Sequence, residues 1–142
     1  MEIKTPQTDA EWKAYYALRF NVLREPWNQP LGSEVLADED QAIHAIAVED
    51  NEVLGVARMH ESAEKQGQVR CVATATAAQG KGIGKAIMAY LEEVAKTKGW
   101  TEIVLEAREN AVPFYQAIGY TILAESYLLF GEIQHYRMSK TL

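Results

Sequence analysis

A glycine-rich stretch between a predicted strand and a predicted helix constrains this chain more than any other feature. It reads Gln79-Gly80-Lys81-Gly82-Ile83-Gly84-Lys85, after the strand-like run 68–74 and before apolar residues at helical spacing. Glycines let the backbone approach a ligand closely, and the free N–H groups of a first helical turn point toward it. The helix dipole and two lysines add positive charge, so the pattern predicts an anion site.

Two common phosphate-binding loops do not fit this stretch. A Walker-type loop, G-x-x-x-x-G-K-[ST], would need glycine in place of Gln79 and serine or threonine in place of Ala86. A dinucleotide fingerprint, G-x-G-x-x-G, would need glycine in place of Lys85 or Ile87, depending on where it starts. The sequence therefore excludes the magnesium–nucleotide and dinucleotide loops.

The remaining pattern, Q-x-x-G-x-G, resembles the pyrophosphate loop of the GNAT superfamily, the GCN5-related N-acetyltransferases that bind acetyl-coenzyme A. A second segment, 105–120, is similar to the strand and short helix that follow in this family. It carries A-x-x-F-Y as Ala111-Val112-Pro113-Phe114-Tyr115 and ends in Gly119-Tyr120. The two motifs occur in the family's order, so the chain is identified as similar to a small bacterial-type, single-domain GNAT protein.

The resemblance implies roles for particular residues. Backbone amides of 81–85 would bind the pyrophosphate, and the strand before the loop would pair with the pantetheine arm. The family's usual proline after that strand is replaced by Thr76. Tyr115 would be the general acid, since a phenol with a pKa near 10 is protonated at pH 7, whereas Phe114 is interpreted as a packing residue. The predicted cofactor-binding residues are Val72, Ala73, Thr74, Gln79, Gly80, Lys81, Gly82, Ile83, Gly84 and Lys85.

The general base stays open in the sequence. An amine with a pKa near 10 is almost fully protonated at pH 7, so a base or a chain of waters is expected to help. The segments 18–23 and 132–138 look like those of a small bacterial GNAT subgroup. That subgroup usually has a glutamine at the position that Arg108 occupies in this chain. Arg19 and Arg24 could contact substrate or cofactor, or only solvate a helix. The candidate bases are water and the residues His44, His60, Glu61, Glu106 and His135.

Composition narrows the class of protein. At 142 residues we predict one domain, 1–142, and the net charge of −6 argues against nucleic acid as a partner. No apolar run approaches the roughly 20 residues of a membrane span. The single cysteine, Cys71, cannot form an internal disulfide, which favours a reducing cytoplasm, and we interpret it as a small core residue. The scattered histidines predict no metal site.

Local patterns predict the order of elements. A capping box at 8–11 opens a first helix, whose apolar positions include Trp12, Tyr15 and Leu18. Strands are predicted at 1–5, 42–48, 53–59, 68–74, 103–107, 120–124 and 135–139, with loop and some helix at 24–37 and a polar turn at 61–67. Asn110 is expected to cap a short helix that ends at Gly119. The order β-α-(α)-β-β-β-α-β-α-β-β predicts an α/β fold, and the resemblance implies a mixed, mostly antiparallel sheet flanked by helices.

The sequence thus predicts acetyl transfer from acetyl-coenzyme A to an amine of a small molecule or peptide, by direct transfer. The alternatives are a non-catalytic acyl-CoA-binding or regulatory module, and acyl transfer to an oxygen or a lactone-forming amine. The oligomeric state is open between a monomer and a homodimer. An acidic cluster before the second predicted strand either attracts a cationic amine or is only a solvated loop. Its members are Glu34, Asp38, Glu39 and Asp40.

Overall fold

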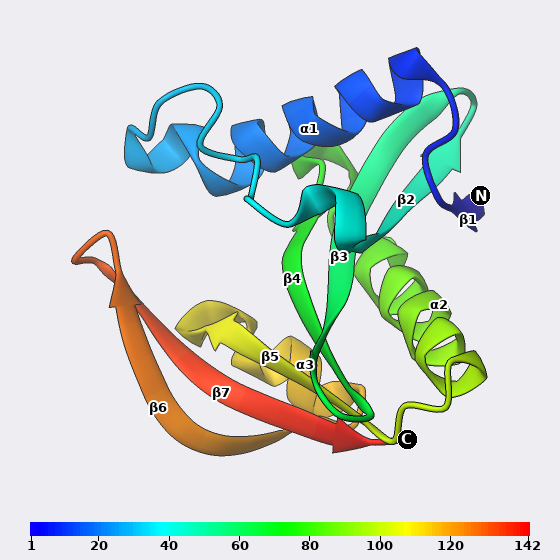
Figure 1. The fold of residues 1–142 in the computed structure, drawn as a ribbon. Helices are drawn as coiled ribbons and strands as arrows, with labels where there is room; N and C mark the ends of the chain where they lie inside the picture. Colours follow the sequence, from blue (N-terminus) through cyan, green and yellow to red (C-terminus); the bar gives the residue numbers. More distant parts are fainter. The chain divides into compact units, whose positions relative to one another are not determined.

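The computed structural model describes residues 1–142 and has the predicted order of elements (Figure 1). Its α-helices are α1 (Asp9–Leu23), α2 (Ile83–Thr97) and α3 (Val112–Ala117). Its strands are β1 (Glu2–Lys4), β2 (Ile43–Glu49), β3 (Glu52–Ala63), β4 (Gln66–Thr74), β5 (Glu102–Arg108), β6 (Thr121–Leu129) and β7 (Ile133–Thr141). Short 3-10 helices occupy Glu25–Trp27, Glu39–Gln41, Thr76–Ala78 and Glu109–Ala111.

The strands follow the order β1-β2-β3-β4-β5-β7-β6 in one sheet. The pairs β1–β2, β2–β3, β5–β7 and β6–β7 are antiparallel, whereas β4 and β5 run parallel over Gln66–Val69 and Glu102–Leu105. The predicted mixed, mostly antiparallel α/β sheet is therefore confirmed. The chain divides into two compact units, the first comprising Met1–His60 and Cys71–Leu91 and the second Glu61–Arg70 and Glu92–Leu142.

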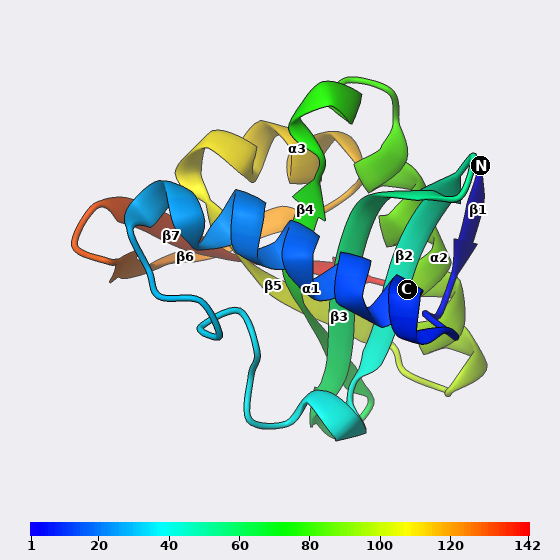
Figure 2. The ribbon, with the colours of Figure 1, turned by 90° about the horizontal axis from the view of Figure 1, so that it is seen from above.

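In the first unit, two helices cover opposite faces of the strands. Helix α1 lies over β2 and β3 in the view from above (Figure 2). Its aromatic and aliphatic side chains pack against these strands. The shared core includes Tyr15, Ile46 and Val56, all fully buried. On the other face, Gly55 of β3 lies directly beneath Ile83 and Ile87 of α2. Burial of these apolar side chains, each contributing about 1.5–3 kcal/mol, holds both helices on the strands.

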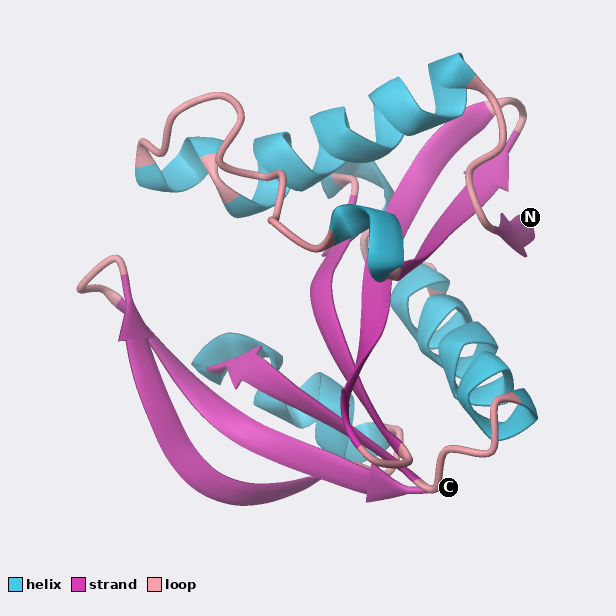
Figure 3. Ribbon diagram, viewed as in Figure 1, coloured by secondary structure: helices cyan, strands magenta, loops and turns pink.

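In the second unit, β5, β7 and β6 form a strongly curved antiparallel ladder (Figure 3). One face of this ladder is tied to the helices, because the Lys140 ammonium donates to the Ile118 carbonyl just after α3 and pairs with Glu92 of α2. The Tyr120 hydroxyl donates to the same Glu92 carboxylate. Strand β6 lies at the end of the sheet order, and most of its residues are exposed.

Several predicted boundaries need correction. The 61–67 turn is much shorter than predicted, because β3 continues to Ala63 and β4 starts at Gln66. Strand β6 begins at Thr121 but continues to Leu129, well past 124, and β7 extends beyond both ends of 135–139. Asn110 does not cap α3: the residue before that helix is Ala111, and no side chain caps it. Sequence patterns underestimate these strands because ladder bonds from a partner strand extend them past their apolar residues.

Candidate functional site

The glycine loop lies at the start of α2, as predicted. Gly80 and Gly82 both have φ near +80°, and a Cβ atom built on either would have no atom within 4 Å. The first backbone bond here is donated by Ala86 to the Gly82 carbonyl, so the amides of 83–85 precede the helical ladder. Lys81 and Lys85 are exposed. This open backbone surface, with helix-end amides and two cations, has the chemistry that a pyrophosphate needs.

The segment before the loop differs from an ordinary strand end. Cys71 has φ of 58°, in the left-handed region that costs a non-glycine residue about 1–2 kcal/mol. The parallel ladder with β5 ends at Val69, so Val72, Ala73 and Thr74 lie beyond it. Cys71 itself packs against the α1 core cluster, as a small hydrophobic residue would. The interpretation of Cys71 as a packing residue agrees with this position, but its backbone conformation was not predicted.

Gly55 is a residue that sequence reasoning missed. A Cβ atom at this position would lie 2.5 Å from Cγ2 of Ile83 and 2.8 Å from Cδ1 of Ile87. Real Cβ atoms do not come this close to other atoms, so only glycine lets the first turn of α2 rest on β3. Because Ile83 belongs to the loop, Gly55 fixes the position of the predicted anion site from the opposite side of the helix.

Tyr115 lies on α3 and is buried, with 7% of its surface exposed. Burial raises the pKa of its phenol, and nearby Arg108 opposes this only in part, so the hydroxyl keeps its proton at every physiological pH. The Tyr115 ring also meets the Tyr120 ring edge-on, with 5.8 Å between the two ring centroids. Phe114, predicted to be a packing residue, is instead exposed at 37%. The short helix turns Tyr115 inward and leaves Phe114 at the surface.

His44 is occupied by the fold and does not suit the role of a base. Its Nε2 lies 2.6 Å from the Glu39 carbonyl oxygen, which can only accept, so Nε2 carries the proton. Its Nδ1 therefore accepts from the Tyr15 hydroxyl at 2.7 Å. Burial lowers the pKa of this imidazole, which favours its neutral form. Among the other candidates, Glu61 is exposed at the end of β3, whereas Glu106 and His135 lie on adjacent strands of the second unit.

Two buried arginines are the main feature of the first unit that the sequence did not reveal. Arg19 and Arg58 are both fully buried. Glu39 pairs with both of them, through Oε2 to Arg19 and through Oε1 to Arg58 at 2.7 Å. Asp38 accepts a bidentate pair of hydrogen bonds from the Arg58 guanidinium, one at each carboxylate oxygen. This interaction lowers the pKa of Asp38 to about 2. Long-range pairing of this kind leaves no local sequence pattern.

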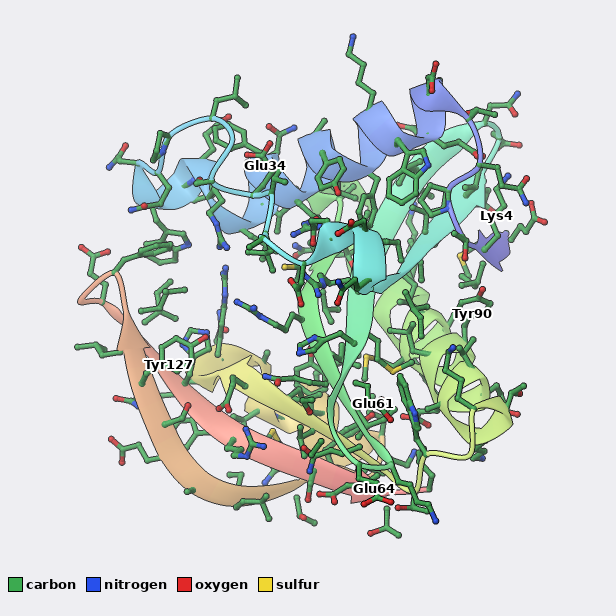
Figure 4. All side chains as sticks on the ribbon, viewed as in Figure 1. Lys4, Glu34, Glu61, Glu64, Tyr90 and Tyr127 are labelled. Carbon is green, nitrogen blue, oxygen red and sulfur yellow. The ribbon has the colours of Figure 1, made fainter.

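The paired arginines change the interpretation of the acidic cluster and of Arg19. Arg19 does not solvate the helix surface, because it donates to Glu39 and to the Glu34 carbonyl. Glu34 is buried too, and its side chain accepts from the Gly32 amide. Figure 4 labels Glu34 in the segment after α1. Three of the four carboxylates are therefore engaged within the chain, and those of Asp38 and Glu39 neutralise its own arginines, whereas Asp40 is exposed.

The structure also bears on metals and membranes. No group of three or more histidine, cysteine, aspartate or glutamate side chains is placed to hold a metal ion. None of the helices combines the length and the apolar character that crossing a bilayer requires.

Comparisons with known proteins bear on the fold and on the family of this chain. A profile of the acetyltransferase (GNAT) family matches residues 9–120. An uncharacterized N-acetyltransferase of Bacillus subtilis, YjcF, is 26% identical over 140 residues, covering 99% of both chains. A candidate N-acetyltransferase from Lactobacillus plantarum superposes with a TM-score of 0.87 at 25% identity, over 99% of this chain and 97% of that one.

An aminoglycoside 6'-N-acetyltransferase complexed with coenzyme A has the same fold, with a TM-score of 0.85 at 17% identity, over 99% of this chain and 97% of that one. The family match covers most of the chain. The chain therefore belongs to the acetyltransferase (GNAT) family.

Proposed function

We propose that this chain is an acetyl-CoA-dependent N-acetyltransferase that moves an acetyl group directly to an amine of a small molecule or peptide. Membership of the acetyltransferase family supports acyl transfer as the reaction class. The observation that carries the proposal is the glycine loop. There, two glycines with open space above them, the amides that begin α2 and two exposed lysines form one anion-binding surface.

Each predicted residue would have its own task in this reaction. The amides of 81–85, with Gln79, Gly80 and the two lysines, would bind the coenzyme's pyrophosphate. Backbone groups of Val72, Ala73 and Thr74 lie beyond the β5 ladder, which suits pairing with an extended pantetheine arm. An N–H group aimed at the developing oxyanion contributes about 3–4 kcal/mol in comparable sites. Tyr115 would give a proton to the leaving thiolate. The free Cys71 thiol supports the cytoplasm as the location.

Calorimetry with two thioesters tests the coenzyme site. Acetyl-CoA should bind far more tightly than acetyl-pantetheine, because the latter lacks the pyrophosphate. Gly82→Val should abolish acetyl-CoA binding, since its side chain would stand where the phosphates approach and its φ of +78° is strained for valine. Gly99→Val is the matched control: Gly99 has φ of +82° and open space as well, but follows the other end of the same helix. Equal affinity for both thioesters would contradict the site.

Thiol release from acetyl-CoA tests catalysis. The wild type should release thiol with at least one member of a panel of alkylamines, polyamines, amino acids, aminoglycosides and peptides. Binding of acetyl-CoA without turnover of any of these amines would favour the non-catalytic acyl-CoA-binding module instead.

A further inference from the structure

One face of the β5–β7 ladder gathers four ionisable side chains. Glu106 is directly opposite Arg137, and Arg108 is directly opposite His135. Side chains of directly opposite residues lie on the same side of a sheet, and residues two apart on a strand share a face. All four therefore share one face. Lys140, at an odd spacing from His135, lies on the other face, where it contacts Glu92 and the residues that follow α3.

The His135 ring is held in one orientation and one tautomer. Its Nδ1 lies 3.0 Å from the Ile133 carbonyl oxygen, which can only accept, so Nδ1 carries the proton in the neutral ring. The ring stacks on that of Tyr127 of β6, with 4.5 Å between the ring centroids and an angle of 10° between the ring planes. Figure 4 labels Tyr127 near the end of the β6–β7 hairpin. No hydrogen bond within the chain engages Nε2, so this atom presents a free lone pair.

Burial is the main reason that the basic form of this imidazole is favoured at neutral pH. Burial lowers the pKa of His135, and the Arg108 guanidinium lowers it further. The Ile133 carbonyl and the Glu106 carboxylate act in the opposite direction, so the group remains a usable base. His44, by contrast, has both ring nitrogens engaged within the fold.

Glu106 supplies an acceptor for a cation. Its Oε1 accepts from Arg137 at 2.7 Å, whereas its Oε2 is buried and has no donor within the chain. A buried carboxylate oxygen without a donor is costly, and an ammonium group can supply the missing hydrogen bond. Glu106 and His135 are diagonal neighbours on the two paired strands. The backbones of such neighbours are about 7–8 Å apart, which long side chains can span.

We propose that Glu106 Oε2 holds the ammonium group of the acceptor and that His135 Nε2 accepts its proton; this rests on the N-acetyltransferase function proposed above. The proton passes from the ammonium nitrogen to Nε2, and the freed lone pair forms the new C–N bond. The C–S bond breaks, and the thiolate leaves with its electron pair and takes the Tyr115 proton. The second amine proton restores Tyr115, and His135 releases its proton to solvent. Each turnover therefore releases one proton.

Two amines of equal length test this role. Propylamine is protonated at pH 7 and needs a base, whereas ethoxyamine has a much lower pKa and arrives as the free amine. His135→Gln should lower kcat/KM for propylamine by about 10²–10⁴, the usual contribution of general base catalysis. It should leave ethoxyamine within a few-fold of the wild type, and it should move the acid limb of the propylamine pH profile up toward the pKa of the amine itself, because only the free amine can then react. Glu106→Gln should raise the KM for propylamine more than that for ethoxyamine.

Tyr136→Phe is the control for disturbance of the strand, since Tyr136 is adjacent to His135 but lies on the other face of β7; it should change neither rate. Equal losses for both amines in His135→Gln would assign His135 a structural role and overturn the proposal. Unchanged rates for both would overturn it too. An active wild type with an unaffected His135→Gln variant refutes only this inference, whereas a wild type that acetylates no amine refutes the proposed function itself.

A measurement without substrate provides a second test. In the free protein, an NMR titration should show His135 titrating below the usual histidine pKa of about 6.5. Glu106→Gln should lower that pKa further, because it removes the one nearby carboxylate that stabilises the imidazolium. A His135 pKa that does not respond to Glu106→Gln would contradict their shared site.

Discussion

Glu39 is expected to be the most sensitive charged residue of the first unit. Its two carboxylate oxygens pair with two different guanidinium groups, those of Arg19 and Arg58, whose side chains are 1% and 0% exposed. With Asp38, the cluster contains two positive and two negative charges. Glu39→Gln keeps the shape of the side chain but leaves one buried cation without its counter-charge. Breaking a buried pair from one side costs about 3–5 kcal/mol, a large share of the 5–15 kcal/mol that typically stabilises a domain.

Urea unfolding followed by circular dichroism measures this cost. With an m value of about 2 kcal/mol/M, a loss of about 4 kcal/mol lowers the unfolding midpoint by about 2 M. Glu93→Gln is the matched control, because Glu93 forms an exposed pair with Lys96 at 3.3 Å and should change the free energy of unfolding by less than about 1 kcal/mol. If Glu39→Gln costs no more than Glu93→Gln, the argument that Glu39 neutralises a buried arginine pair is wrong.

Three other substitutions test the roles of Tyr115, Gly55 and His44. Tyr115→Phe should lower kcat by about 10²–10⁴ in the thiol-release assay while acetyl-CoA affinity by calorimetry stays unchanged; a variant that keeps its kcat would return Tyr115 to a packing role. Gly55→Ala should destabilise the protein by about 1–3 kcal/mol in urea unfolding, because its Cβ would overlap Ile83 and Ile87, and Ile87→Val in the same chain should recover part of the loss. The pKa of His44 is lowered in the folded state, so the unfolded chain binds more protons between that pKa and about 6.5. The free energy of unfolding should therefore fall as the pH drops from 7 through this interval, and a His44→Gln variant with the same pH slope as the wild type would contradict this.

The sequence by itself determined the features that depend on a few neighbouring residues. The capping box forms as predicted, with the Thr8 hydroxyl accepting from the Glu11 amide at 3.1 Å and Glu11 accepting in return from the Thr8 amide. Asp50 and Asn51 make the short turn between the strands predicted at 42–48 and 53–59, with positive φ, which these residue types tolerate well. The glycine loop before α2 belongs to the same class. Each of these signals lies within a few positions of the chain, so its physics is complete in the sequence.

Tertiary structure decided the burial, the partners and the chemical state of the polar residues. The sequence left Arg19 open between contact with a ligand and solvation of a helix, whereas it is buried, and Glu39, 20 positions away, makes its burial tolerable. His44 and His135 could not be distinguished as bases, because one has both ring nitrogens engaged by other segments and the other has one nitrogen free. The shared face of Glu106 and His135 depends on the register of β5 and β7, which a slip of one residue would reverse. The positive φ of Cys71 has no local signal either. Charge and hydrogen-bond partners act through space, so residues distant in sequence settle which groups are buried, paired or free.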